Sequence, residues 1–180
     1  EKVEEKAGRA GPLVFVTVRH TVSGAGGPAL EEAQDLVYRR VSGPAAPAGA
    51  GPAPEGRWRR RVVPDDVLLF RYSALTFNGH RIHYDRRYAT AAEGYPGLVV
   101  HGPLVATLLL DLLGRSLPGR AVERFRFRGL RPTFDTPPFT VEGGPGDGPD
   151  HVRLWSTDNQ GQVGVEAEAW LGPPVPPPSP

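Results

Sequence analysis

The 180-residue chain contains no cysteine, which excludes disulfide bonds, thiolate catalysis and the usual cysteine-based zinc sites. Net charge is also small: at +1 it offers no strong field that would favour nucleic acid or an acidic membrane surface. The chain has no apolar run long enough to cross a bilayer, and its N-terminus lacks a signal-peptide pattern. These absences predict a soluble, cytoplasmic protein without a nucleic-acid or membrane partner.

Methionine is absent as well, and the chain opens on Glu1. We therefore expect a fragment or processed piece of a longer protein, with an exposed sheet edge and lower stability than the intact product. Lysine occurs only at Lys2 and Lys6, whereas arginine, alanine, glycine and proline abound. This composition indicates a GC-rich genome and carries no information about activity.

Turn residues and composition divide the chain into four parts. After a charged lead-in, the β-branched run LVFVTVRHTV, a GAGG turn and EEAQDLVYRR predict a hairpin over residues 13–40, which needs other strands to pack upon. We therefore place the first unit at residues 1–41 and a Pro/Ala/Gly-rich linker at residues 42–56. The main domain is predicted over residues 57–171, and residues 172–180 are predicted to be a disordered, proline-rich tail.

The main domain reads as one buried helix followed by strands. GPLVATLLLDLLGRSL, residues 102–117, is apolar on nearly every face, with Pro103 in its first turn. DDVLLFRYSALT predicts a shorter helix capped by Asp65 or Asp66, and RWRRRVV predicts a solvated strand or linker edge. Four strand-like runs follow: AVERFRFRGL, PFTVEG, HVRLWSTDNQ and VGVEAEAWL. This order predicts an α+β fold in which an antiparallel sheet wraps around the helix.

The stretch TFNGHRIHYD, residues 76–85, concentrates polar and ionisable groups. Three of the chain's five histidines lie close together in the sequence, at His80, His83 and His101. His80-x-x-His83 with Asp85 matches no recognised metal-ligand set, so a zinc or iron site would depend on how the fold closes, and no G-x-S-x-G elbow supports a serine triad. Gly102 opens the buried helix, so the free N–H groups there would stabilise negative charge on a carbonyl oxygen. A histidine-rich loop beside such a helix end suits proton transfer next to a carbonyl.

TFNGHRIHYD followed by GLVVHGPL resembles the MaoC-like (R)-specific enoyl-thioester hydratases, also called 3-hydroxyacyl-thioester dehydratases. Their signature is roughly S-G-D-x-N-P-x-H, followed by a hydrophobic-His-Gly turn into a central helix. The resemblance covers residues 67–139 and is closest to the two-hot-dog branch of mesaconyl-C4-CoA hydratases and type 2 dehydratases. It implies a hot-dog fold, with residues 1–41 as the end of a degenerate first hot dog, and a homodimer or pseudo-dimer of hot dogs.

By position, the resemblance implies that His83 is the catalytic histidine and that Asn78 stands where the family has its catalytic aspartate. Gly102 matches the glycine whose N–H binds the thioester oxygen. An amide is not a base near neutral pH, so His83 would carry most of the proton transfer while Asn78 positions the water. Three further residues are candidates for orienting the substrate or for structural contacts: His80, Arg81 and His101.

Each of these positions also has a structural interpretation. Asn78 before a glycine fits a left-handed turn, and His101 fits a hydrogen bond to backbone ahead of the helix. The pair Tyr84 and Asp85 fits a turn or an N-cap. The alternating RFRFR run fits a half-buried strand, which we favour over contacts with the phosphates of CoA. The arginines that would make such contacts are Arg126, Arg128 and Arg131.

The resulting hypothesis is reversible hydration of a trans-2-enoyl thioester, carried by CoA or by acyl carrier protein, to a 3-hydroxyacyl thioester. Mesaconyl-C4-CoA or a related C4–C5 acyl-CoA is a candidate substrate, and the chemistry needs no metal, flavin or nicotinamide. Two alternatives stay open. One is a non-catalytic hot-dog module that binds acyl thioesters, since Asn78 replaces the aspartate, and the other is a thioesterase on the same fold.

Overall fold

The computed structural model describes residues 2–8, 11–39 and 53–174, in two compact units divided between residues 46 and 47. In the first unit, β1 (Lys2–Gly8), β2 (Gly11–Gly24) and β3 (Gly27–Arg39) form an antiparallel sheet in that order. Gly27 has a φ of 103°, which a residue with a side chain rarely adopts, and it closes the predicted GAGG turn. The predicted hairpin is confirmed, but the expected lead-in is a third strand.

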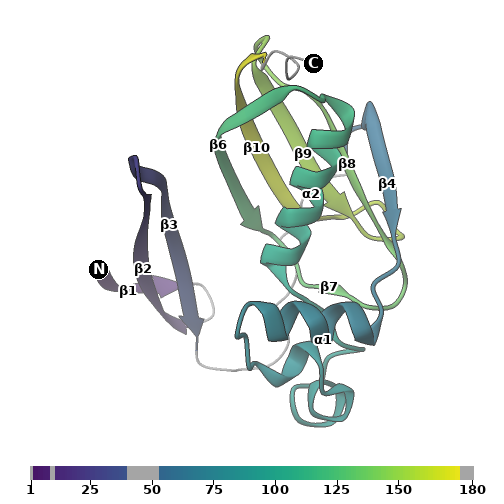
Figure 1. Ribbon diagram of the computed structural model, residues 1–180. Helices are drawn as coiled ribbons and strands as arrows, with labels where there is room; N and C mark the ends of the chain where they lie inside the picture. The colour runs from purple at the N-terminus through teal and green to yellow at the C-terminus, as the bar shows by residue number, and fades with distance from the viewer. Residues whose placement is uncertain (1, 9–10, 40–52, 175–180) are drawn as a thin grey trace. The chain divides into compact units, whose positions relative to one another are not determined.

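The second unit places one long helix on a five-stranded sheet. Its helical elements are α1 (Asp66–Leu75), the 3₁₀ turn η1 (Arg81–His83), the π-helical turn η2 (Tyr88–Ala92) and α2 (Gly102–Ser116). Its strands are β4 (Trp58–Val62), β5 (Val99–Val100), β6 (Arg120–Gly129), β7 (Thr133–Phe134), β8 (Phe139–Pro145), β9 (His151–Thr157) and β10 (Val163–Pro174). The antiparallel sheet has the order β4-β8-β9-β10-β6, and β5 pairs with β7. α2 runs obliquely across this sheet, with α1 beyond its lower end (Figure 1).

α2 forms the centre of the core, as its apolarity on every face predicts. Its buried residues are Leu104, Val105, Ala106, Leu109, Leu112 and Leu113. They pack against buried side chains of the sheet, among them Phe139, Val141 and Leu154. Burying each leucine stabilises the fold by about 1.5–3 kcal/mol. The predicted α+β architecture, the buried helix and the four predicted strands are therefore confirmed.

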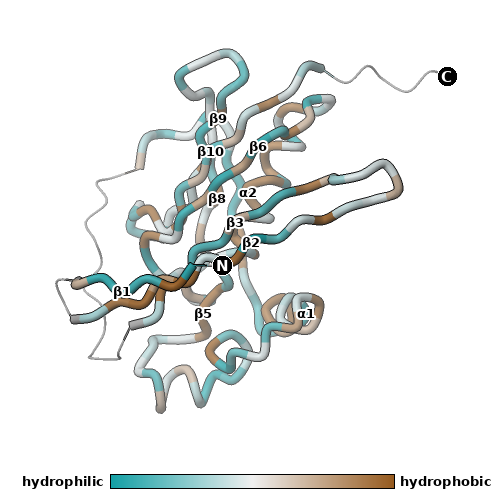
Figure 2. Tube along the Cα trace, turned by 90° about the vertical axis from the view of Figure 1, so that its left-hand side faces the viewer, coloured by the Kyte–Doolittle hydropathy of each residue, from teal (hydrophilic) through white to brown (hydrophobic). Residues whose placement is uncertain are grey.

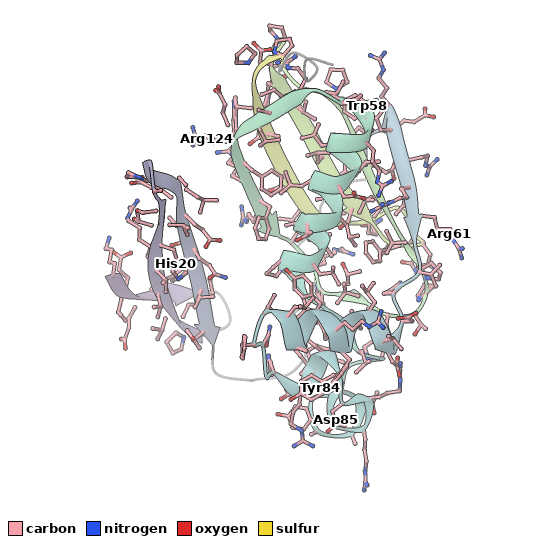
Figure 3. All side chains as sticks on the ribbon, in the orientation of Figure 1. His20, Trp58, Arg61, Tyr84, Asp85 and Arg124 are labelled. Carbon is pink, nitrogen blue, oxygen red and sulfur yellow. The ribbon has the colours of Figure 1, made fainter. Side chains whose placement is uncertain are left out.

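RWRRRVV is predicted to be a solvated strand or linker edge; it forms the edge strand β4, and its arginines do not all face solvent. Arg60 Nη1 donates to Asp111 Oδ2 on α2 at 2.5 Å. Arg115 Nε donates to the same oxygen at 2.9 Å. Arg115 foremost, and then Arg60, lower the pKa of Asp111. The pair Arg60–Asp111 therefore ties the edge strand to the helix, while Trp58 and Arg61 lie near its two ends (Figure 3).

The predicted linker and tail lie partly outside the described residues, at residues 40–52 and 175–180. Where the predicted linker is described, Ala53 N donates to Gly161 O at 3.4 Å, so its last residues belong to the second unit. β10 continues to Pro174, so strand replaces the start of the predicted tail. The three boundaries between the four predicted parts otherwise stay predictions. In the described parts of the chain, every helix is too short or too polar to cross a membrane.

Candidate active site

The polar stretch TFNGHRIHYD forms a compact loop between α1 and η2. Asn78 N donates to Ser73 O at 2.9 Å, which turns the chain away from the end of α1. His83 N donates to His80 O at 3.2 Å and closes η1. This turn buries His83, which keeps 8% of its surface exposed, while His80 stays exposed. The loop therefore separates its two histidines into different environments.

Two contacts fix the far end of this loop. Asp85 Oδ1 accepts from Tyr88 N at 3.0 Å and caps the following turn, so the capping role predicted for Tyr84-Asp85 is confirmed. Arg81 donates to Asp85 Oδ2 at 2.7 Å and lies 4.2 Å from the centre of the Tyr88 ring. Arg81 is exposed and engaged in these contacts, which favours its structural interpretation. Tyr84 and Asp85 mark the loop in Figure 3.

His83 is held in one tautomer by the backbone. Its Nδ1 lies 2.7 Å from the carbonyl oxygen of Val99, and a carbonyl only accepts, so Nδ1 carries the proton. Nε2 is then the unprotonated nitrogen of the neutral ring. Burial foremost lowers the pKa of His83, and the charge that His80 can carry lowers it further, whereas the Val99 hydrogen bond raises it. His83 is thus a neutral base near pH 7.

A second imidazole covers one face of His83. The His101 ring stacks on the His83 ring with 3.7 Å between centroids and 17° between planes. His101 Nε2 lies 2.8 Å from Ser73 Oγ on α1, and Tyr72 meets the same ring edge-on at 4.9 Å. The predicted backbone hydrogen bond of His101 is therefore wrong: its partner is the Ser73 hydroxyl, which comes from a distant helix.

Gly102 directly follows His101 and is the first residue of α2. The first N–H groups of a helix have no intrahelical acceptor, and Pro103 contributes none, so the positive end of the helix dipole lies at Gly102. A Cβ added at Gly102 would meet open space. The sequence therefore places an accessible, polarising N–H next to the two stacked histidines.

Asn78 makes a side-chain turn. Its Oδ1 accepts from His80 N at 3.0 Å, which leaves the Nδ2 donors for a water or a substrate. The left-handed residue is Phe77, with a φ of 52°, rather than Asn78, so the predicted left-handed conformation of Asn78 is wrong. The His80 ring lies edge-on to His83, with 5.7 Å between centroids. The exposed His80 ring thus borders His83, and Asn78 is bonded to the backbone of His80.

An ion-pair network that the sequence did not reveal fixes this site. Arg86 donates to Asp66 at the start of α1 and to the buried carboxylate of Asp135, each at 2.5 Å. Asp135 Oδ1 accepts from Leu98 N at 2.9 Å, just before β5. A Cβ on Gly97 would lie 2.4 Å from that same oxygen, so glycine is required there. Arg86 and Asp135 therefore join α1, the loop and β5.

Two of the three arginines considered for CoA phosphates, Arg126 and Arg128, lie on β6. Arg126 pairs with Glu168 across β6 and β10. Arg126 and Arg128 line a cavity of about 480 Å³ over the sheet, together with Trp155, and none of the site histidines lines it. Phe125 packs against the core, but Phe127, which lies on the same face of the strand, is 41% exposed, so β6 is more exposed than the predicted half-buried strand. Arg124 extends from the same strand (Figure 3).

The sequence of this chain is similar to those of several known proteins. A family model described as hydroxyacyl-thioester dehydratase type 2 matches residues 1–135. The chain is 46% identical over 172 residues to mesaconyl-C(4)-CoA hydratase of Chloroflexus aurantiacus, covering 94% of this chain and 60% of that protein. The chain belongs to the hydroxyacyl-thioester dehydratase type 2 family. It is also 42% identical over 81 residues to the mitochondrial type 2 dehydratase of Schizosaccharomyces pombe, covering 44% of this chain and 27% of that relative.

Solved structures confirm the fold of this family member. A MaoC-like dehydratase from Phytophthora capsici matches with a TM-score of 0.72 at 17% identity, covering 95% of this chain and 63% of that chain. The (R)-hydratase from A. caviae matches with a TM-score of 0.56 at 22% identity, covering 71% of this chain and all of that chain. The predicted hot-dog fold is therefore confirmed.

Proposed function

We propose that this type 2 dehydratase chain carries the site of an enzyme that reversibly hydrates a trans-2-enoyl thioester to a 3-hydroxyacyl thioester. The observation that carries the proposal is the state of His83. Its Nδ1–H is committed to Val99 at 2.7 Å, which leaves Nε2 as a base in a buried ring beside the open end of α2. The hydratase and dehydratase names of its relatives support the same chemistry.

In the hydration direction, His83 Nε2 takes a proton from a water while the water oxygen bonds to C3 of the substrate. The π electrons of the C2–C3 bond move towards the thioester oxygen, where the Gly102 N–H and the α2 dipole stabilise the enolate. The proton then passes from His83 to C2, so one water is added and no cofactor is consumed. The Asn78 amide, whose Oδ1 is held by His80 N, positions the water through its remaining donors.

The substrate proposal follows the sequence relatives. Identity of 46% to a mesaconyl-C(4)-CoA hydratase supports mesaconyl-C4-CoA or a related C4–C5 acyl thioester, carried by CoA or by acyl carrier protein. Because the chain spans 60% of that relative's length, the substrate and the assembly belong to the proposal. A homodimer or pseudo-dimer of hot dogs and a cytoplasmic location are part of it as well.

The test follows the absorbance of crotonyl-CoA and mesaconyl-CoA with purified intact protein and with His83→Ala. We expect turnover to fall by about 10²–10⁴-fold, which is typical for loss of a general acid–base group. Thioester binding should persist, because the Gly102 N–H remains. His20→Ala is the matched control, since His20 is an exposed histidine on β2 whose ring contacts the side chain of Glu32. Equal turnover for His83→Ala and the control would contradict the proposal.

The binding-module alternative rests on Asn78 standing where the family has its catalytic aspartate; in the structure the Asn78 side-chain oxygen accepts a hydrogen bond from His80 N. Asn78→Asp tests it, because a carboxylate oxygen can accept that same hydrogen bond and keep the turn. If Asn78 only positions water, the variant should hydrate enoyl-CoA at least as fast as the unmodified protein. A protein that binds acyl-CoA, shows no hydration and is unaffected by both substitutions would be a binding module.

A further inference from the structure

The chemistry proposed above gives His101 no task, yet His101 is among the most completely buried polar residues of the second unit. Only 1% of its surface is exposed, and its Nδ1 has no hydrogen-bond partner among the residues that the structure describes. An imidazole in such a place costs more than an apolar ring, because its unpaired nitrogen loses its hydration. A leucine or phenylalanine would fill the volume at lower cost, so packing alone does not account for this histidine.

The contacts of His101 point to His83. Its ring lies 3.7 Å from the His83 ring and 17° from parallel, which covers one whole face of the base. Its Nε2 is fixed 2.8 Å from Ser73 Oγ, and Ser73 is itself only 5% exposed. Ser73 also accepts a backbone hydrogen bond from Asn78 N at 2.9 Å. One buried serine thus contacts both the ring that covers His83 and the loop that carries it.

We propose that Ser73 and His101 are positioning residues which hold His83 as a neutral base with its Nε2 turned to the substrate. The serine hydroxyl sets the plane of the His101 ring, and that ring excludes water from one face of His83 and stops it from tilting. A phenylalanine would exclude water but could not be fixed by Ser73. This inference rests on the proposed function only for the effect of Ser73 and His101 on turnover.

The groups around the two rings are compatible with a neutral His83. The groups that face His83 are the Val99 carbonyl from β5, the His80 ring from the loop and the His101 ring. Those that face His101 are Ser73 and Tyr72 from α1, and His83. The described contacts of both rings include no carboxylate, so nothing nearby favours an imidazolium. In agreement, burial foremost, and then His83, lower the pKa of His101 to about 4. His101 therefore stays neutral whenever His83 acts as a base.

The first arm of the test needs no turnover. Nitrogen-15 spectra of the five histidines, with His83 assigned from His83→Gln, report the tautomer and titration midpoint of its ring. We expect a Nδ1–H tautomer in the unmodified protein. His101→Ala opens the stacked face to water, so the midpoint should rise by about one pH unit and the tautomers should mix. His101→Phe keeps water away from that face of the His83 ring, so the titration midpoint of His83 should not change.

The second arm measures turnover. Ser73→Ala keeps the stack but frees the ring, so kcat should fall by roughly 10-fold or more while KM changes little. The acid limb of kcat/KM should move to higher pH in His101→Ala and not in His101→Phe. If His101→Ala does not fold, His101→Gln replaces it, since glutamine can bond Ser73 but cannot stack. An unchanged His83 midpoint and tautomer in all variants would overturn the inference. Shifted midpoints in a protein without hydratase activity would refute the proposed function alone.

Discussion

At the scale of single residues, identical side chains differ by environment. His80 and His83 lie three positions apart, but only His83 is buried and bonded to a backbone carbonyl, while His80 is exposed. Burial lowers the pKa of His83 because the charged form loses hydration, and the Val99 carbonyl decides which nitrogen keeps the proton. A base at Nε2 is therefore a product of the fold around η1 rather than of the residue type.

Gly102→Ala tests whether the substrate binds at the N-terminus of α2 without destabilising the protein. The added methyl meets open space, and alanine favours a helix over glycine, so stability should stay equal or rise slightly. The same methyl would stand where a thioester oxygen must approach the N–H, so kcat/KM should fall by roughly 10²-fold. The measurements are thermal unfolding and enoyl-CoA hydration.

Gly114→Ala is the matched control for that substitution. Gly114 lies in the same helix, and a Cβ there also meets open space, so it should gain about 0.5–1 kcal/mol of stability without loss of activity. Full activity in Gly102→Ala would show that the thioester oxygen does not bind at this helix end.

The residues of the site were predictable only where they share a local motif. The His83 loop and the Gly102 turn were identified because each stands in a short, recognisable run. Ser73, Arg86 and Asp135 were missed, because their roles depend on contacts with residues 28, 20 and 49 positions away. A serine among the apolar residues of a predicted helix was the one available signal for Ser73. For Asp135 the sequence offered only a turn.

At the scale of elements, α1 differs from α2 in how it uses its apolar residues. Asp65 Oδ1 caps α1 by accepting from Leu68 N at 2.7 Å, as the sequence predicts. Yet several large apolar residues on or beside this helix are exposed: Val67 at 55%, Phe70 at 60%, Leu75 at 81% and Phe77 at 97%. The apolar stretches of α1 are visible in Figure 2. α1 therefore stabilises the site through Leu69 and Ser73 rather than through a continuous buried face.

Phe77 adopts a left-handed backbone, with a φ of 52°, at the position where the family signature has glycine. That conformation destabilises a residue with a Cβ by about 1–2 kcal/mol. The Phe77 ring is exposed, so burial of its surface offsets little of this destabilisation. Phe77→Gly should therefore raise the unfolding free energy by about 1 kcal/mol in urea titrations. Phe77→Ala keeps the Cβ and should leave stability nearly unchanged. If both substitutions destabilise the protein equally, the ring is packed against a surface in solution.

Element prediction succeeded where pattern and length agree. α2 and the strands β6, β8, β9 and β10 carry long periodic or β-branched runs, and each was found. β1 was missed because its alternating charges, KVEEKAG, look like a solvated lead-in. β5 and β7 have two residues each and pair only through the fold. Short pairings of this kind have no sequence signal, because tertiary contacts alone stabilise them.

At the scale of the whole molecule, the two units differ in how they are stabilised. The second unit has one continuous core around α2. In the described part of the first unit no side chain is buried, and Val3, Val22, Leu30 and Val37 are each more than half exposed. A small sheet without a buried face is marginal in water. The free energy of unfolding therefore resides mainly in the second unit, which also contains the histidines of the site.

The stability of that unit should depend on pH through His101. Its pKa is about 4 in the fold and has an ordinary value of 6.5, so below pH 6.5 the unfolded chain binds a proton that the folded chain refuses. The stabilisation is complete above that pH and is lost as the pH falls towards 4. For one such group the loss is roughly 2–3 kcal/mol between about pH 7.5 and 4.5.

Urea unfolding of the unmodified protein and of His101→Phe at these two pH values measures that loss. The carboxyl groups of Asp85 and Asp111 have pKa values lowered from 3.8, foremost by the Tyr88 N–H and by Arg115 respectively, so their stabilising contribution is lost only below this pH range. The difference between the two slopes therefore belongs to His101 and to the charge it can place beside His83. His101→Phe should show the shallower decline. Parallel declines would mean that the buried imidazole takes up its proton without cost, and that the stack beside His83 admits water.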